Sequence, residues 1–317
     1  MNIHNLAKYI VPIVAVYKGE RVIPLGTGFI VGTFSDNRAI LVTASHIIGY
    51  AKSEDSQPSR HHITALKEFL PKEDPVYVWE HMKLFALFTD GKGTTVNANI
   101  DRCWFDKERD VAFCGISCDA DINLGDVIPF KKKIRMQSYG PEIGDKVFAV
   151  GFPNVIDNSE QFENINAEFE MFSLDMEVVI NEGYVANRFD TIGPGNHKWP
   201  CFQVTCPLLS GMSGGPILIE KDNELIACGV ISSDINISGC AASGEHAFAS
   251  LIWTSFYIET DIKHNIEGSN EDVDASTILS LVKSGVISDI DDACKNARII
   301  YDDNGIPITI IWVKDNI

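Results

Sequence analysis

His46, Asp110 and Ser213 are the residues of this 317-residue sequence whose types and settings point to covalent chemistry. His46 follows two apolar segments, Asp110 begins the apolar run 110–116, and Ser213 lies in the glycine-rich stretch 210–216. A serine hydroxyl attacks a carbonyl efficiently when a histidine accepts its proton and a buried carboxylate orients that histidine. The three residues therefore predict acyl transfer through a covalent intermediate.

The glycines around Ser213 permit a tight turn in which the amide groups of Gly211 and Ser213 point toward one place. Two such donors form an oxyanion hole, which stabilises the developing negative charge of a transition state. Each segment also has a plain structural interpretation, because histidines after strands and aspartates before strands are common in folded proteins. In addition, Gly-x-Ser-x-Gly at 211–215 matches the nucleophile elbow of α/β-hydrolases.

Chain order separates the two hydrolase interpretations. In α/β-hydrolases the serine comes first, so Asp234 and His246 would have to complete the site. That fold also needs helices alternating with parallel strands, and the sequence contains few helical patterns. The order His46, Asp110, Ser213 is the chymotrypsin-like order, which we therefore favour.

Short β-type runs separated by turn residues extend to about residue 258 and predict the elements that position these groups. Six candidate strands precede a connection over residues 117–144, and six more follow it. The predicted fold class is all-β, with two packed six-stranded antiparallel β-barrels and a small helix-plus-hairpin C-terminal extension. Residues 1–120 are predicted to form an N-terminal barrel with His46, Asp110 and an insertion at 51–75. Residues 121–258 are predicted to form a C-terminal barrel with Ser213 and the specificity pocket, and residues 259–317 form the extension.

Local patterns refine two of these regions. Residues 153–170 are polar and predict a long loop. In the extension, residues 275–284 have helical periodicity with Gly285 as the C-cap, and residues 298–313 predict a hairpin. The dipeptide Asn304-Gly305 would form the turn of that hairpin.

Composition excludes several classes of partner and cofactor. Acidic residues outnumber basic ones by 44 to 26, and the formal net charge of −18 disfavours nucleic acid and anionic membranes. The apolar run 9–17 contains Pro12 and lacks a signal-peptide cleavage site, so we expect a first strand and a cytoplasmic protein. The eight cysteines have no zinc-site spacing, and we expect reduced thiols with no metal or organic cofactor.

Six motifs in sequence resemble the trypsin/chymotrypsin-like serine peptidase superfamily over residues 10–258, especially bacterial intracellular and high-temperature-requirement-type members. The motifs are GTGFIV, LVTASHI, RDVAF, GDKVFAVGFP, EGYVAN and GMSGGPIL. The resemblance implies that His46 is the general base, Asp110 its orienting group and Ser213 the nucleophile, with the amides of Gly211 and Ser213 as the oxyanion hole. It also implies that Ser232 lies beside the catalytic aspartate.

The resemblance further implies that an edge strand formed by Ser232, Ser233 and Asp234 pairs with the backbone of a polypeptide substrate. Pro207 stands where trypsin has an acidic residue in its specificity pocket, so Pro207 and Leu208 predict an apolar or small-residue pocket. His246 is a rival binding group that would receive an acidic side chain.

Two departures from the family concern regulation. Met212 stands where zymogens have an aspartate before the nucleophile, so activation by N-terminal cleavage is not expected. Residues 259–317 are too few for the PDZ domain of high-temperature-requirement proteases. We expect them to pack on the barrels as a structural appendage, and the alternative is that they bind a partner.

The favoured function is a serine endopeptidase controlled by a protein partner, activator or ligand, as in bacterial regulated or defence-associated proteases. Control would come from a narrow substrate set or from a resting state with a disordered loop 207–213. The alternatives are a catalytically silent double-barrel binding module and an esterase that uses the same three residues.

Overall fold

The computed structural model describes most of the two barrels and much of the C-terminal region. The described residues are 7–17, 21–35, 38–48, 72, 81–89, 95–105, 109–118, 133–158, 174–195, 197–232, 247–265, 272–287, 296–303 and 307–312. Nearly all of the insertion predicted at 51–75 lies outside them. No helix among these residues has the length and apolar character needed to cross a membrane.

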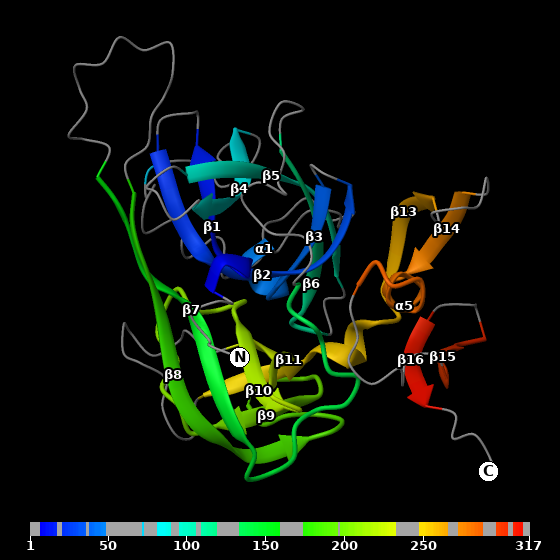
Figure 1. Ribbon diagram of the computed structural model, residues 1–317. Coiled ribbons are helices and arrows are strands. Elements are labelled where there is room, and N and C mark those ends of the chain that lie inside the picture. The colour runs from blue at the N-terminus through cyan, green and yellow to red at the C-terminus, as the bar shows by residue number, and fades with distance from the viewer. Residues whose placement is uncertain are drawn as a thin grey trace.

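The first barrel is a closed antiparallel sheet with the strand order β1-β2-β3-β6-β5-β4 (Figure 1). Its inward side chains include Phe29, Leu41 and Phe113, which are all fully buried. The six strands are β1 (Ile10–Tyr17), β2 (Arg21–Ser35), β3 (Arg38–Thr43), β4 (Met82–Thr89), β5 (Thr95–Phe105) and β6 (Ala112–Ser117).

The second barrel is also closed and antiparallel, with the order β10-β11-β12-β9-β8-β7. The two barrels confirm the predicted fold class. The second set of strands is β7 (Lys146–Asp157), β8 (Leu174–Phe189), β9 (Cys201–Val204), β10 (Pro216–Lys221), β11 (Glu224–Ile231) and β12 (Phe248–Leu251).

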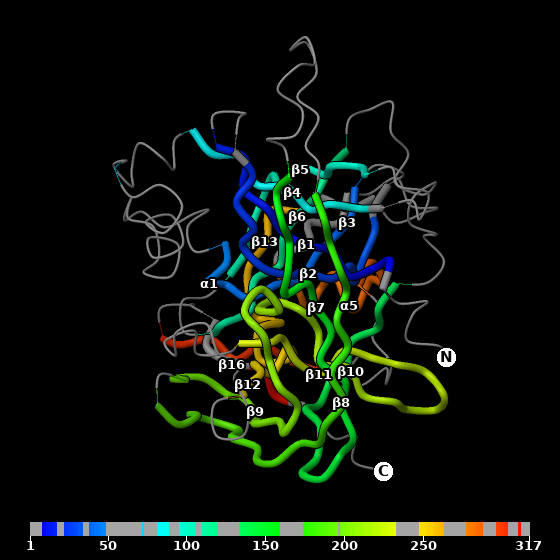
Figure 2. The backbone as a smooth tube through the Cα atoms, turned by 90° about the vertical axis from the view of Figure 1, so that its left-hand side faces the viewer, coloured from blue at the N-terminus to red at the C-terminus, as the bar shows by residue number. Residues whose placement is uncertain are grey.

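The β7–β8 hairpin reaches from the second barrel across the outside of the first, as both ribbon and tube show (Figures 1 and 2). Val155 of β7 and Met176 of β8 pack against a buried cluster that includes Val14 and Val16 of β1. This contact explains why all eight residues of β1 are buried: one face lies in the barrel core and the hairpin covers the other. The loop predicted at 153–170 was therefore wrong for residues 153–157, which continue β7.

The described part of the C-terminal extension consists of two hairpins and a short helix, with the first hairpin level with the first barrel and the second hairpin level with the second barrel (Figure 1). The acidic segment that follows residue 258 forms a hairpin that the sequence did not predict. The predicted helix begins only at residue 278, where Thr277 is the N-cap of a capping box. The elements are β13 (Glu259–Asn265), β14 (Asp272–Thr277), α5 (Ile278–Lys283), β15 (Ala297–Tyr301) and β16 (Pro307–Trp312).

Specific contacts attach the extension to the first barrel and to the segment that connects the two barrels. Trp104 Nε1 of β5 donates to Asp261 Oδ1 of β13 at 2.8 Å, and Lys133 Nζ donates to the carbonyl of Val286 at 2.8 Å. The extension thus packs on a barrel, as expected. The hairpin predicted at 298–313 is present as β15 and β16, and its Asn-Gly turn lies outside the described residues.

Candidate active site

The pairing of β3 with β6 brings His46 and Asp110 together although they are 64 residues apart. In this register Thr43, the last residue of β3, lies opposite Ala112, the first residue of β6. The chain leaves β3 into the single helical turn α1 (Ser45–Ile48), which carries His46. Asp110 stands just before β6, so both side chains emerge at the same end of two neighbouring strands.

The carboxylate of Asp110 is buried, with 5% of the residue exposed, and accepts hydrogen bonds on both oxygens. His46 Nδ1 lies 2.8 Å from Oδ2, and the backbone N–H of His46 donates to Oδ1 at 3.0 Å. Ser45 Oγ also donates to Oδ1, at 3.1 Å, and Ser232 Oγ donates to Oδ2. A buried charge is stable only when it is paired and hydrogen-bonded, and this set of donors meets that requirement.

These contacts determine the protonation of the pair. Burial raises the pKa of Asp110. The charge of His46 and the hydrogen bonds from His46 and Ser232 lower this pKa by more than burial raises it, so the net pKa lies well below the ordinary value. An ionised carboxylate only accepts, so Nδ1 of His46 must donate, and the neutral ring keeps its lone pair on Nε2. Burial lowers the pKa of His46, whereas the charge and hydrogen bond of Asp110 raise it, and the net pKa is raised. His46 is therefore an oriented base.

Ser213 lies in a loop between β9 and β10 that contains two glycines with positive φ. The N–H of Met212 donates to the carbonyl of Leu209 at 3.0 Å, which closes a turn with Gly211 in its third position. Gly211 has φ +88°, as a type II turn requires at that place, and Gly214 has φ +83°. Ser213 is 1% exposed.

Close packing adds a second reason for these glycines. A Cβ on Gly211 would lie 2.7 Å from the carbonyl oxygen of Phe152, and one on Gly214 would lie 2.1 Å from Thr43 Oγ1. Side chains at either position would push the loop away from β7 or from β3. The turn can therefore sit against both barrels only with glycine at 211 and 214.

The serine loop is attached to the first barrel beside α1. The N–H of Thr27 in β2 donates to the carbonyl of Ser213 at 2.8 Å, and Thr43 Oγ1 donates to the carbonyl of Thr27 at 2.7 Å. A Cβ on Gly214 would lie 2.7 Å from Ile47 Cδ1, so the residue after Ser213 touches the residue after His46. The structure thus places all three predicted catalytic residues at one junction between the barrels.

The predicted substrate-binding residues have diverse surroundings. Ser232 lies beside Asp110, as the resemblance implied. Pro207 is exposed and its carbonyl accepts a hydrogen bond from Asn181 Nδ2 at 2.8 Å. Leu208 is only 1% exposed and belongs to the core of the second barrel.

Three further predicted binding residues lie outside the described part of the chain, and their roles stay predictions: Ser233, Asp234 and His246.

Sequence reasoning missed two groups that support the site. Ser45 Oγ bonds to the Asp110 carboxylate, and its position directly before His46 was the available signal. His197 is buried, and its Nε2 lies 3.0 Å from the carbonyl oxygen of Ser232. The ring of Phe248 lies 4.4 Å from that of His197 and fixes its place. No local pattern predicted this contact.

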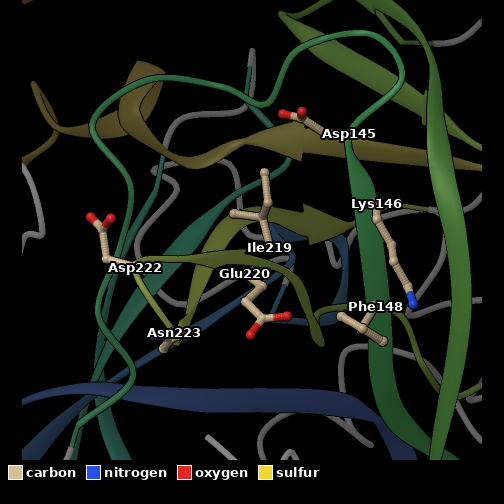
Figure 3. A pocket seen from close by; sticks show the side chains of 7 residues that line it. All are labelled: Asp145, Lys146, Phe148, Ile219, Glu220, Asp222 and Asn223. Carbon is tan, nitrogen blue, oxygen red and sulfur yellow. The ribbon is translucent and has the colours of Figure 1, made fainter.

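A shallow pocket of about 450 Å³ lies elsewhere, on the second barrel where β7 begins and β10 turns into β11 (Figure 3). It contains none of the residues that surround Asp110 or Ser213. Within the described ranges, no group of three His, Cys, Asp or Glu residues has the arrangement of a metal site. The pocket is lined by Asp145, Lys146, Phe148, Ile219, Glu220, Asp222 and Asn223.

The chain is similar to one protein family and to several solved structures. Residues 26–227 match the family described as a trypsin-like peptidase domain. Among solved structures, Deg5 has 17% identity and a TM-score of 0.43, with 79% of this chain and 88% of that chain covered. The HtrA-type protease AlgW with a decapeptide has 14% identity and a TM-score of 0.43, with 79% and 62% covered.

The active form of the Rv3671c protease from M. tuberculosis has 13% identity and a TM-score of 0.44, with 79% of this chain and 78% of that chain covered. No curated protein matches the sequence. The family match includes His46, Asp110 and Ser213 and covers well over half of the chain. The chain belongs to the trypsin-like peptidase family.

Proposed function

We propose that this protein is a serine endopeptidase that cleaves peptide bonds through an acyl-enzyme on Ser213. One observation carries the proposal: Nδ1 of His46 is held at 2.8 Å from a buried, ionised Asp110. That contact leaves Nε2 as the basic atom, at the junction where the serine loop is attached. Burial of the pair makes the interaction between the two charges stronger than it would be in water.

The chemical steps follow from this arrangement. Ser213 Oγ attacks the peptide carbonyl carbon while Nε2 of His46 takes the hydroxyl proton. The amides of Gly211 and Ser213 stabilise the oxyanion of the tetrahedral intermediate. The imidazolium then gives its proton to the leaving amine as the C–N bond breaks. A water molecule attacks the acyl-enzyme by the same route, with His46 as base, and releases the carboxylic acid.

The turn before Ser213 supports activation without N-terminal cleavage. Met212 is fully buried, its sulfur lies 3.4 Å from the amide of Leu209, and it is 3.9 Å from Asn181 Nδ2. Met212, which also belongs to the buried apolar cluster of the second barrel, therefore occupies the position where zymogens have an aspartate. Since the turn has a defined conformation, we favour control by a narrow substrate set, with a partner or ligand that delivers or selects the substrate.

A cleavage assay with an unbiased peptide mixture tests the proposal. The purified chain is incubated with the mixture, and new peptide termini are identified by mass spectrometry, with Ser213→Ala as the control. We expect internal cleavages that disappear in the variant. If both chains leave the peptides intact while the wild type hydrolyses p-nitrophenyl esters, the esterase alternative is correct. If neither substrate reacts, the result contradicts an endopeptidase that is active on its own and favours the binding-module alternative.

A further inference from the structure

Thr27 is fully buried where the two barrels meet, and its hydroxyl takes part in two hydrogen bonds. Thr27 Oγ1 donates to the carbonyl of Gly211 at 2.8 Å across 184 residues of sequence. The same oxygen accepts from the N–H of Phe152 at 2.9 Å. The backbone N–H of Thr27 donates to the carbonyl of Ser213 at 2.8 Å.

The direction of these bonds is fixed by the groups involved. The N–H of Phe152 can only donate, so Thr27 Oγ1 must accept there. Its single proton is then free to go to the carbonyl of Gly211, which can only accept. One hydroxyl thus links β2 of the first barrel to β7 and to the serine loop of the second, with no competing arrangement of its proton.

The two carbonyls that Thr27 holds belong to Gly211 and Ser213, whose amides are the proposed oxyanion donors. Holding both carbonyls restricts the two peptide units that follow these amides. Gly211 needs such restriction, because a glycine at φ +88° has no side chain to limit its other conformations. Preorganised donors stabilise a transition state only if they do not have to reorganise during the reaction.

We propose that Thr27 is a positioning residue for the oxyanion hole, acting through the bond from its hydroxyl to the carbonyl of Gly211. This role rests on the proposed function of Ser213. The backbone bond from Thr27 is available to any residue at this position, but the bonds to Gly211 and Phe152 need a hydroxyl. Valine has the shape of threonine without that hydroxyl, and serine keeps it.

The test measures inactivation by a fluorophosphonate probe, separated into probe affinity (KI) and phosphonylation rate (kinact). Phosphonylation places negative charge on an oxygen that the same amides stabilise. We expect Thr27→Val to lower kinact by about 10- to 100-fold, with KI within about twofold and an unchanged pH profile. Thr27→Ser should stay within about threefold of the wild type.

A matched control is Thr254→Val, which removes a buried hydroxyl that donates to the carbonyl of Leu251 at 2.8 Å, away from the site. It should lose stability without losing kinact. If Thr27→Val does not fold, Thr27→Ala is measured with the same expectation. Equal kinact in the wild type and the Thr27 variants overturns the role of Thr27 alone. A wild-type chain that does not react overturns the proposed function and this role with it.

Discussion

Replacing Asp110 with asparagine tests how the carboxylate sets the protonation of His46. The backbone N–H of His46 lies 3.0 Å from Oδ1, and because an N–H only donates, the asparagine oxygen must take this place. The asparagine NH₂ group then faces Nδ1, which lies 2.8 Å from Oδ2 in the native pair. Nδ1 must present its lone pair to this donor, so the ring proton moves to Nε2. That atom can then no longer accept the proton of Ser213.

The magnitude follows from two effects. The variant loses the attraction between imidazolium and carboxylate, about 4 kcal/mol for unit charges about 4 Å apart at an effective dielectric constant of about 20. Restoring the reactive tautomer places two donors against each other, and a buried unsatisfied polar group costs about 1–3 kcal/mol. Since about 1.4 kcal/mol changes a rate tenfold, acylation should slow by about four to five orders of magnitude.

The assay is the rate at which a fluorophosphonate probe labels the Asp110→Asn variant, measured beside the wild type at a pH where His46 is neutral. Thermal unfolding of both chains establishes that the variant is folded. A folded variant that labels within tenfold of the wild-type rate would refute the reasoning, because neither the tautomer nor the charge of Asp110 would then matter.

Three other perturbations follow from the structure. Because the pKa of His46 is raised, the ring stays protonated to higher pH, and labelling should appear only as the pH rises through a value above the ordinary histidine pKa of about 6.5. A midpoint at or below that ordinary value contradicts this. Gly211→Ala forces a Cβ to 2.7 Å from the carbonyl oxygen of Phe152 and should lower the labelling rate by at least about tenfold. A labelling rate close to that of the wild type would disprove this expectation. Asp261→Ala removes the hydrogen-bond acceptor of Trp104 and should lower the free energy of unfolding by about 1 kcal/mol, while the labelling rate stays native. Chemical denaturation measures this change, and unchanged stability would argue against the contact as an anchor of the extension.

The barrels were predictable because their strands bury apolar faces that local patterns reveal. The far end of the β7–β8 hairpin was less visible, since Pro153 and Asn154 have low strand propensity. These residues are in β7 because the next residue, Val155, packs against the buried cluster of the first barrel that includes Val14. Packing between the two barrels therefore overrides the local preference of these residues. A short stretch of sequence contains no information about such packing.

The acidic hairpin β13–β14 has the same explanation. Aspartates disfavour strands, yet the pairing of Ile262 with Ala275 joins the two strands to each other. The bond from Trp104 to Asp261 then holds the hairpin on the first barrel.

At the site, the predicted residues came from types, spacing and chain order. The role of the Thr27 hydroxyl was not predicted, because a threonine in β2 gives no local signal of a partner 184 residues away. Only the packing of the two barrels against each other places Thr27 Oγ1 against the carbonyl of Gly211.

The most direct measurement of the central claim is fluorophosphonate labelling of the full chain followed by mass spectrometry of its peptides. We predict one adduct per chain, on Ser213, that is absent in Ser213→Ala and in His46→Ala. The alanine variant of His46 keeps the nucleophile and loses the base, so it separates an assembled site from an exposed serine. An adduct on a different residue, or a wild-type chain without any adduct, would contradict the assignment of Ser213 as the nucleophile.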